Sequence, residues 1–223
     1  MEARDRLALA LDVDDLVEAV RLARLLRPWF GFAKVGLELF SAAGPEAIGA
    51  MRSLGYSVFC DVKLHDIPNT VRGAARVLGS IGVDLLTLHA VGGEVMLRAG
   101  VEGLTEGAEA AGLPTARALA VTILTSEGRR STVLDERVAD AVESGCAGVV
   151  CSAADVRAAK RLAPRLLAVV PGIRPEGVPA HDQAAPATPR AALDEGADIL
   201  VIGRAVTGAA DPAAAAAALA RDV

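Results

Sequence analysis

Short apolar runs alternate with longer helical patterns along the whole chain, and this alternation restricts the fold more than any other feature. The runs are rich in Val, Leu and Ile and are nearly continuous, as expected of strands covered on their outer face. Strands that alternate with helices form a parallel sheet, and eight such units close most naturally into a (β/α)8 barrel of the TIM type. The eight expected strands are Leu7–Asp12, Phe32–Gly36, Ser57–Lys63, Leu85–His89, Arg117–Ile123, Gly148–Cys151, Leu167–Pro171 and Ile199–Gly203.

Helical patterns fill the intervals between these runs, and several of them begin with recognisable start signals. Asp14 and Ser152 can cap the helices that follow them, and Pro45 suits a first turn. The pair Asp211-Pro212 opens the last helix. Examples of the expected helices are Asp14–Leu26, Pro45–Leu54, Val71–Ile81 and Ala153–Leu162.

The composition is that of a single domain with a large core. Hydrophobic residues make up 52% of the chain but aromatic residues only 3%, so the core must be built from Ala, Val, Leu and Ile. No linker is visible, and we expect residues 1–223 to form one domain. The net charge is −5 and no basic block stands out, which argues against nucleic-acid binding. No apolar run has membrane-spanning length and the N-terminus lacks a signal-peptide pattern, so we expect a cytoplasmic protein without a membrane partner.

The chain has three cysteines, Cys60, Cys146 and Cys151, which lack the spacing of metal ligands. An odd number of this kind does not suggest a disulfide framework or a zinc site. We interpret them as small buried hydrophobic residues, since Cys60 and Cys151 lie in apolar strand-like runs.

Charged residues of alternating sign lie on the first three expected strands, in the order Asp12, Lys34, Asp61 and Lys63. Residues two apart in a strand share a face, so Asp61 and Lys63 point the same way and Val62 points the other way. Inward is favoured, because outward would place two charges against the helices. Such charges persist when they pair. The set is either an ordinary ion-pair network of the barrel rim or a catalytic cluster, and its place at the catalytic face of barrels favours catalysis.

The longest irregular stretch runs from about 172 to 188, after the seventh expected strand, and four prolines occur from Pro171 onward. Gly172 and Gly177 can act as hinges. A structureless segment of this length inside a domain is usually functional. We interpret it as a lid that closes over the site, and the alternative is a merely tolerated loop.

The eighth expected strand ends at Gly203 and Arg204, a pair suited to bind an anion. Glycine lets the backbone approach an anion closely, and arginine offers a planar, bidentate donor. Barrels often bind phosphate through the loops after strands seven and eight, and Gln183 of segment 172–188 can contribute. An isolated Gly-Arg pair would indicate only a turn and a surface charge, but this position favours a phosphate site.

Two other sets of polar residues leave their role open. Thr125 and Ser126 follow the fifth strand, where they can hydrogen-bond a polar ring or, equally well, serve in a cap or turn. The histidines suit acid–base chemistry, but none has a partner at metal-ligand spacing. A structural or solvent-exposed role is therefore favoured for His65, His89 and His181.

The segment DVKLHDIPNT (Asp61–Thr70) resembles the signature of the orotidine 5′-monophosphate decarboxylase family, whose core is Asp-x-Lys-x-x-Asp followed by Ile-x-x-Thr. Sister families share the core, but further motifs of this family follow in order through most of the chain. The resemblance implies a (β/α)8 barrel that converts orotidine 5′-monophosphate to UMP without a metal or an organic cofactor. The further motifs are LALDVDD (Leu9–Asp15), KVGLELF (Lys34–Phe40), LTLHAVGG (Leu86–Gly93), VTILTS (Val121–Ser126), VPGIRPEG (Val170–Gly177) and DILVIGRAVTG (Asp198–Gly208).

The resemblance also implies which residues carry out the chemistry. Lys63 would deliver a proton to the ring carbon, and Asp61 would lie against the substrate carboxylate. Lys34 would bridge the ribose and the catalytic carboxylate. Asp66, also catalytic, would reach with Thr70 across a homodimer interface into the neighbouring site.

Substrate binding would fall to residues at the ends of several strands. The resemblance implies that the ribose, the edge of the pyrimidine, the wall of the pocket and the phosphate each have their own contacts. These are Asp12 and Lys34 for the ribose, Thr125 and Ser126 for the pyrimidine, Pro171 for the wall, and Gln183, Gly203 and Arg204 for the phosphate. The sequence departs from the family at His181, where a glycine is expected, within the proposed lid.

Two competing interpretations remain. A magnesium-dependent sugar-phosphate decarboxylase or aldolase of the same suprafamily would share Asp-x-Lys-x-x-Asp, but those enzymes carry Glu where this chain has Lys34. A metal site needs clustered oxygen ligands, so a lysine there argues against one. An inactive barrel that binds a nucleotide without turnover is the second alternative, and the complete set of four charges argues against it.

Overall fold

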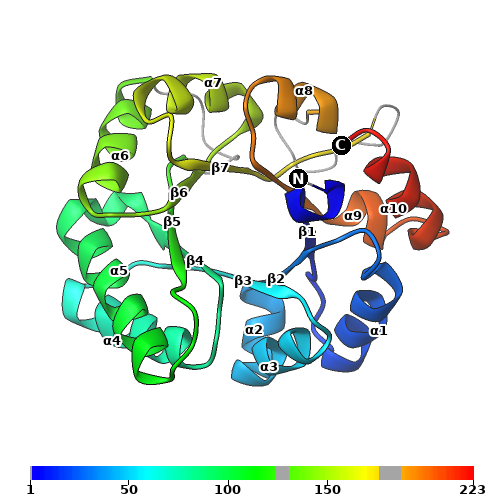
Figure 1. The fold of residues 1–223 in the computed structure, drawn as a ribbon, viewed down its shortest axis with the longest axis horizontal. Helices are drawn as coiled ribbons and strands as arrows, with labels where there is room; N and C mark the ends of the chain where they lie inside the picture. The colour runs from blue at the N-terminus through cyan, green and yellow to red at the C-terminus, as the bar shows by residue number, and fades with distance from the viewer. Residues whose placement is uncertain (1, 124–130, 176–186) are drawn as a thin grey trace.

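Eight parallel strands close into one barrel in a computed structural model, which describes residues 2–123, 131–175 and 187–223 apart from the side chain of Ser131. Each strand pairs with the next along the chain, and the last pairs with the first (Figure 1). The predicted fold class is therefore confirmed. The strands are β1 (Leu7–Ala10), β2 (Phe32–Gly36), β3 (Ser57–Leu64), β4 (Leu85–His89), β5 (Arg117–Val121), β6 (Gly148–Val150), β7 (Leu167–Val170) and β8 (Ile199–Ile202).

The α-helices lie around the outside of this barrel (Figure 1). Within the described ranges, no helix is both long enough and apolar enough to cross a bilayer. The helices are η1 (Ala3–Arg6), α1 (Leu16–Leu26), α2 (Leu37–Ala43), α3 (Pro45–Ser53), α4 (Pro68–Ser80), η2 (Ala90–Gly92), α5 (Gly93–Ala110), α6 (Ser131–Glu143), α7 (Ala153–Leu162), α8 (Pro189–Asp194), α9 (Arg204–Thr207) and α10 (Pro212–Ala220).

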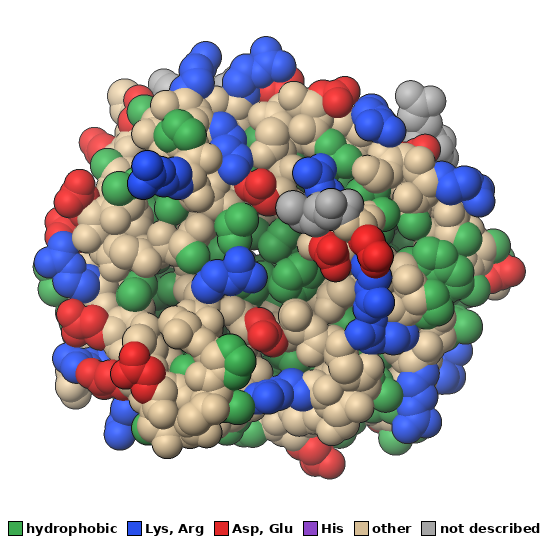
Figure 2. All heavy atoms as spheres, viewed as in Figure 1, with side chains coloured by type: hydrophobic (Ala, Val, Ile, Leu, Met, Phe, Trp, Pro, Cys, Tyr) green, Lys and Arg blue, Asp and Glu red, His purple; other side chains and the backbone are tan. Residues whose placement is uncertain are grey.

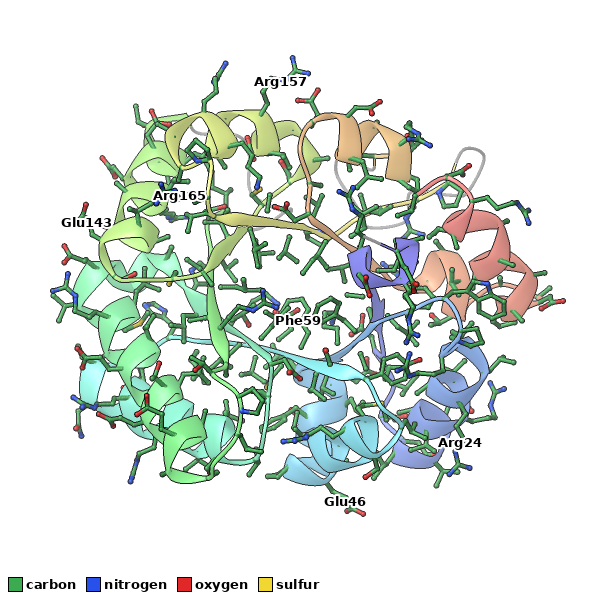
Figure 3. All side chains as sticks on the ribbon, viewed as in Figure 1. Arg24, Glu46, Phe59, Glu143, Arg157 and Arg165 are labelled. Carbon is green, nitrogen blue, oxygen red and sulfur yellow. The ribbon has the colours of Figure 1, made fainter. Side chains whose placement is uncertain are left out.

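The strands carry two apolar layers because successive side chains point to opposite faces. In β3, Phe59 lies inside the barrel, whereas Cys60 packs against the helices. Figure 3 shows Phe59 at the centre of the barrel, and Figure 2 shows apolar side chains gathered there with charged ones around the rim. The inner layer consists of Ala8, Ala10, Phe59, Leu85, Leu119, Val121, Val150, Val169, Ile199 and Val201. As the composition predicts, both layers are built mainly from aliphatic residues.

Most predicted strands extend one or two residues too far at their carboxyl ends. Asp12, Ile123, Pro171 and Gly203 lie beyond the last paired residue, where the chain turns into the loops that line the site. In the sequence these residues continue the runs that predicted the strands, but in the structure they make no strand pairing. By contrast, β3 continues one residue further than predicted, to Leu64.

The helix-start predictions are partly confirmed. Pro45 opens α3, and Asp211 caps α10 by accepting a hydrogen bond from Ala214 N at 3.0 Å. The prediction for Asp14 is wrong, because Asp15 is the capping residue and accepts from Val17 N at 2.9 Å. Ser152 occupies the cap position of α7, but its hydroxyl donates to the Asp155 carboxylate rather than capping the backbone.

The pairing of β3 with β4 is irregular near its end. Cys60 pairs with Leu86 and Leu64 pairs with Leu88, so β3 advances four residues while β4 advances two. Within this bulge Lys63 has a φ of 49°, and it is the one non-glycine residue of the described ranges with a positive φ. A lysine in the left-handed region costs about 1–3 kcal/mol, and such strain is concentrated at functional sites.

Helices α4 and α5 cross in direct backbone contact. A Cβ added to Gly103 would lie 2.2 Å from the carbonyl oxygen of Arg72, and one added to Gly107 would lie 1.9 Å from that of Arg76. On the other side of the crossing, a Cβ on Gly79 would lie 2.3 Å from the carbonyl oxygen of Leu104. These glycines let the two helices approach more closely than any side chain would allow.

Candidate active site

Four charged side chains form a continuous chain of ion pairs at the carboxyl-terminal end of β1, β2 and β3. Lys34 Nζ lies 2.9 Å from Asp12 Oδ1 and 3.6 Å from Asp61 Oδ2. Lys63 Nζ lies 2.9 Å from Asp61 Oδ1. We call Asp12, Lys34, Asp61 and Lys63 the tetrad. The prediction that these residues come together is confirmed, and Val62 packs outward against the helix layer as predicted.

Asp61 lies at the centre of the tetrad, and its side chain is 13% exposed. Burial alone would raise the pKa of its carboxyl group, but the charges of Lys34 and Lys63 act in the opposite direction. Hydrogen bonds from Lys63 and Thr87 add to this effect, and the pKa is held below its usual value. Asp61 therefore remains an anion, flanked by two ammonium groups in a poorly solvated place.

Thr87 is a part of the site that the sequence analysis missed. It lies on β4, is fully buried, and donates a hydrogen bond to Asp61 Oδ1 at 3.0 Å. Its oxygen also accepts a hydrogen bond from Lys63 N at 2.9 Å. A signal was available, because strand alternation from the inward-facing Leu85 places Thr87 on the inner face.

Gly36, at the end of β2, is a second residue of the site that the sequence analysis missed. A Cβ there would lie 2.9 Å from both Asp12 Oδ1 and Lys34 Nζ, which is closer than real Cβ atoms come to other atoms. A side chain at this position would therefore displace Asp12 or Lys34 from the geometry of their ion pair. Its position two residues after Lys34 puts it on the same strand face, but the sequence carries no signal for the space that it leaves.

Two adjoining cavities open beside the tetrad and share Lys34, Asp61, Pro171 and Val201. The first has a volume of about 180 Å³ and is predominantly polar. The second has a volume of about 140 Å³ and is predominantly apolar. The first is also lined by Ala10, Asp12, Gly172, Ile173, Arg174, Gly203, Arg204 and Ala205, and the second by Phe59, Lys63, Val121, Ile123, Val150 and Cys151. Together they suit a molecule with a polar, anionic end and a flat, less polar end.

The polar cavity contains two of the three residues predicted to hold a phosphate. Gly203 and Arg204 both line it, as does Arg174, which is buried and was not singled out from the sequence. Pro171 contributes to the wall of both cavities. Five residues named in the sequence analysis lie outside the described residues, namely Thr125, Ser126, Gly177, His181 and Gln183.

Asp66 and Thr70 lie apart from the tetrad, on the loop after β3 and the first turn of α4, and both are exposed. The carboxylate of Asp66 accepts a hydrogen bond from Ile67 N at 2.7 Å. Nearby, the ring centres of His65 and His89 are 5.8 Å apart. His65 is exposed and His89 is half-buried. Among the described residues, no hydrogen bond or ion pair joins Asp66 or Thr70 to the tetrad of its own chain.

The cysteines are small buried residues, as predicted, and none is in a disulfide. Burial raises the pKa of Cys151 to about 12, and burial together with the charge of Asp61 does the same for Cys60. Burial also raises the pKa of Cys146 to about 11. Neutral thiols are poor nucleophiles and poor metal ligands. In the described part of the chain, no three His, Cys, Asp or Glu side chains are grouped so that they could hold a metal ion.

The chain is similar over its whole length to known decarboxylases. The orotidine 5′-phosphate decarboxylase of Moorella thermoacetica is 45% identical, with all of this chain and 94% of that protein aligned. That of Nitratidesulfovibrio vulgaris is 47% identical, with 96% and 95% aligned. The crystal structure of orotidine 5′-phosphate decarboxylase from Lactobacillus acidophilus superposes with a TM-score of 0.81 at 34% identity, covering 98% of each chain. Residues 5–219 match the profile of the orotidine 5′-phosphate decarboxylase / HUMPS family, and the chain belongs to that family.

Proposed function

We propose that this protein is a carboxy-lyase that converts orotidine 5′-monophosphate to UMP and CO2, the last step of de novo pyrimidine biosynthesis. The observation that carries the proposal is the tetrad, in which a buried carboxylate lies between two ammonium groups at the junction of a polar and an apolar cavity. Relatives that are about 45% identical over nearly their whole length bear the name of this activity.

Decarboxylation of the pyrimidine leaves an electron pair on an sp² ring carbon that has no electron sink. A nearby cation stabilises that charge, and Lys63 lines the apolar cavity where the ring would lie. A pair of unit charges about 4 Å apart is worth about 4 kcal/mol at an effective dielectric constant of about 20. Lys63 then protonates the ring carbon as the bond to CO2 breaks.

Asp61 has two roles in this proposal. Its carboxylate forms an ion pair with the Lys63 ammonium group and so positions the proton donor. It also lies against the position of the substrate carboxylate, where its negative charge raises the energy of the bound ground state and so favours departure of CO2. A carboxylate suits both roles only if it stays ionised, and the low pKa of Asp61 meets that condition.

The remaining proposed contacts place the parts of the substrate along the two cavities. Asp12 and Lys34 hold the ribose, and Pro171 forms the wall between the cavities. Gly203, Arg204 and Gln183 hold the phosphate, while Thr125 and Ser126 bind the edge of the pyrimidine. Binding energy from the distant phosphate orients the ring over Lys63.

Segment 172–188 acts as the lid over the phosphate in this proposal. Near its ends, Ile173 pairs with Ala187 in a β-bridge, and Arg174 N donates to Ala187 O at 2.9 Å. This pairing holds the two ends of the segment together beside the polar cavity, the position a lid needs. Binding of UMP is expected to increase the protection of the segment's amides from hydrogen exchange. Unchanged protection at saturating UMP would contradict the lid.

The active unit is a homodimer in which Asp66 and Thr70 enter the partner's site. Both side chains are exposed at the rim. Exposed apolar side chains lie on the segments that follow β3 and β4, namely Ile67 at 67%, Val91 at 51% and Val95 at 71%. Covering them with a second copy would remove this apolar surface from water.

Mixing two inactive variants, Lys63→Ala and Asp66→Ala, tests the shared site. After dissociation and reassociation, half of the dimers are mixed, and each mixed dimer has one intact site. Recovered activity should then approach about a quarter of the wild-type value. If Asp66 acts within its own chain, every site keeps one lesion and mixing recovers nothing, even when mass spectrometry shows that the subunits exchange.

The activity itself is tested by incubating the purified protein with orotidine 5′-monophosphate and following the loss of orotate absorbance, with and without EDTA. Turnover that is unaffected by EDTA is expected, since we propose a reaction without metal or organic cofactor. Turnover lost with EDTA and restored by magnesium would favour the sister sugar-phosphate enzymes, and UMP binding without turnover would indicate an inactive barrel. We further propose that the protein acts in the cytoplasm, because its substrate and product are charged nucleotides that do not cross membranes.

A further inference from the structure

Lys63, whose ammonium group is the proposed proton donor, has an unusual backbone conformation. Its φ of 49° lies in the left-handed region, which lysine rarely adopts. It also lies within the β3 bulge, between the pairs Cys60–Leu86 and Leu64–Leu88. The regular ladder therefore does not hold this residue, and some other contact has to fix its conformation.

The hydroxyl group of Thr87 makes that contact. It accepts a hydrogen bond from Lys63 N at 2.9 Å, in the part of the sheet where the register of β3 and β4 shifts. It donates its proton to Asp61 Oδ1 at 3.0 Å. The same carboxylate oxygen accepts from Lys63 Nζ at 2.9 Å. One hydroxyl thus connects the backbone of Lys63 to the anion that its own ammonium group contacts.

Packing alone does not account for a threonine at this position. Apart from the tetrad, the inner layer of the barrel consists of apolar residues such as Leu85 and Val121, and Thr87 is fully buried. Valine has nearly the same shape and would fill the same space without a polar group. What valine lacks is the donor and the acceptor, and each of these is used toward a residue of the tetrad.

We propose that Thr87 is a positioning residue, whose hydroxyl holds Lys63 in its left-handed conformation and fixes the carboxylate of Asp61 beneath it. Thr87 acts on the reaction through these two residues and does not line either cavity. The inference rests on the proposed decarboxylation for its kinetic consequence, but the structural part stands without it.

The kinetic test compares Thr87→Val with Thr87→Ser and with the control Thr105→Val. Thr105 lies on α5, where its hydroxyl donates to Val101 O, remote from the tetrad. Thr87→Val is expected to lower kcat about ten- to a hundredfold while KM changes less than about threefold, since phosphate and ribose contacts remain. Thr87→Ser keeps the hydroxyl and is expected to retain kcat within about threefold, and Thr105→Val to match the wild type. A kcat for Thr87→Val near that of the wild type would overturn the proposal.

A second measurement does not depend on activity. Exchange of the Lys63 amide is followed in wild type, Thr87→Ser and Thr87→Val, and the amide is expected to lose protection in the valine variant alone. If the wild type does not decarboxylate but this loss occurs, the proposed function fails and the positioning contact stands. Equal protection in all three would overturn the positioning role. So would a failure of both Thr87→Val and Thr87→Ala to fold while Thr87→Ser folds, since the hydroxyl would then serve stability.

Discussion

The two ends of the barrel both carry an aspartate–lysine pair, and the surroundings of the two pairs differ. At the amino-terminal end, Lys160 Nζ lies 2.6 Å from Asp198 Oδ2. Lys160 also donates to Leu166 O, and Asp198 also accepts from Ala168 N. Backbone groups thus hold both partners of the pair in place, and the pair links α7 to the starts of β7 and β8.

At the carboxyl-terminal end, Asp61 and Lys63 are 2.9 Å apart, and their other neighbours are the Thr87 hydroxyl, charged side chains and the open space of the cavities. Asp61 is shared with Lys34, and Lys63 lines the apolar cavity. An ion pair that is held by backbone hydrogen bonds stabilises the fold, whereas an ion pair beside a cavity keeps hydrogen-bonding groups for a ligand. The distance between the charges does not distinguish these cases, and the surroundings do.

Replacing the lysine of each pair is the strongest test of this difference. Lys63→Ala is expected to lower kcat by roughly a thousandfold or more, because it removes the charge that stabilises the ring anion, while UMP still binds. Lys160→Ala is expected to leave kcat unchanged and to lower the free energy of unfolding by about 1–2 kcal/mol. Steady-state decarboxylation, calorimetry with UMP and urea unfolding measure these effects. A nearly normal kcat for Lys63→Ala would show that Lys63 is not the proton donor.

Arg204 extends the comparison from the reactive part of the site to the binding part. Arg204→Ala is expected to raise KM and the Kd of UMP by about ten- to a hundredfold, because a charge-assisted contact to the phosphate is lost. The matched control is Arg157→Ala, which removes an exposed arginine paired with Glu195 on the outer surface. If the two variants have the same KM, Arg204 does not hold the phosphate.

The smallest effect concerns the pH dependence of stability. The pKa of Asp61 is lower in the folded protein than its usual value of 3.8, so the folded state binds this proton less readily than the unfolded state. Its contribution to stability is therefore present above about pH 4 and is lost as the pH falls through the folded-state pKa. The difference in free energy of unfolding between wild type and Asp61→Asn should shrink as the pH is lowered from about 6 to about 3. A difference that does not change with pH would mean that Asp61 is not held as an anion by its neighbours.

The alternation of apolar runs was sufficient to predict every strand, because each strand is a local pattern. Residue spacing also predicted that Asp61 and Lys63 share the inner face, and the structure confirms this. Strand pairing is not a local property, however. The register shift between β3 and β4, and with it the role of Thr87, depends on residues 24 positions apart, which periodicity within either strand does not reveal.

Two further residues were missed for a different reason. Gly36 matters for the volume it leaves empty beside Asp12 and Lys34, and sequence patterns do not report empty volume. Arg174 lies in a stretch assigned to the lid, so its burial in the wall of the polar cavity was not foreseen. Side-chain chemistry was therefore predictable from the sequence, while the steric and pairing constraints around it were not.

The backbone contact between α4 and α5 has a consequence for anyone who wishes to make this protein more heat-resistant. Replacing a helical glycine with alanine usually stabilises a protein by about 0.4–1 kcal/mol, because the unfolded chain loses freedom. At Gly103 and Gly107 the same exchange would force the two helices apart, since the added methyl group would overlap a carbonyl oxygen. At Gly49 and Gly73 an added Cβ meets no atom within 4 Å. Gly49 and Gly73 can thus accept a methyl group, whereas Gly103 and Gly107 belong to a seam that cannot, although all four look alike in the sequence.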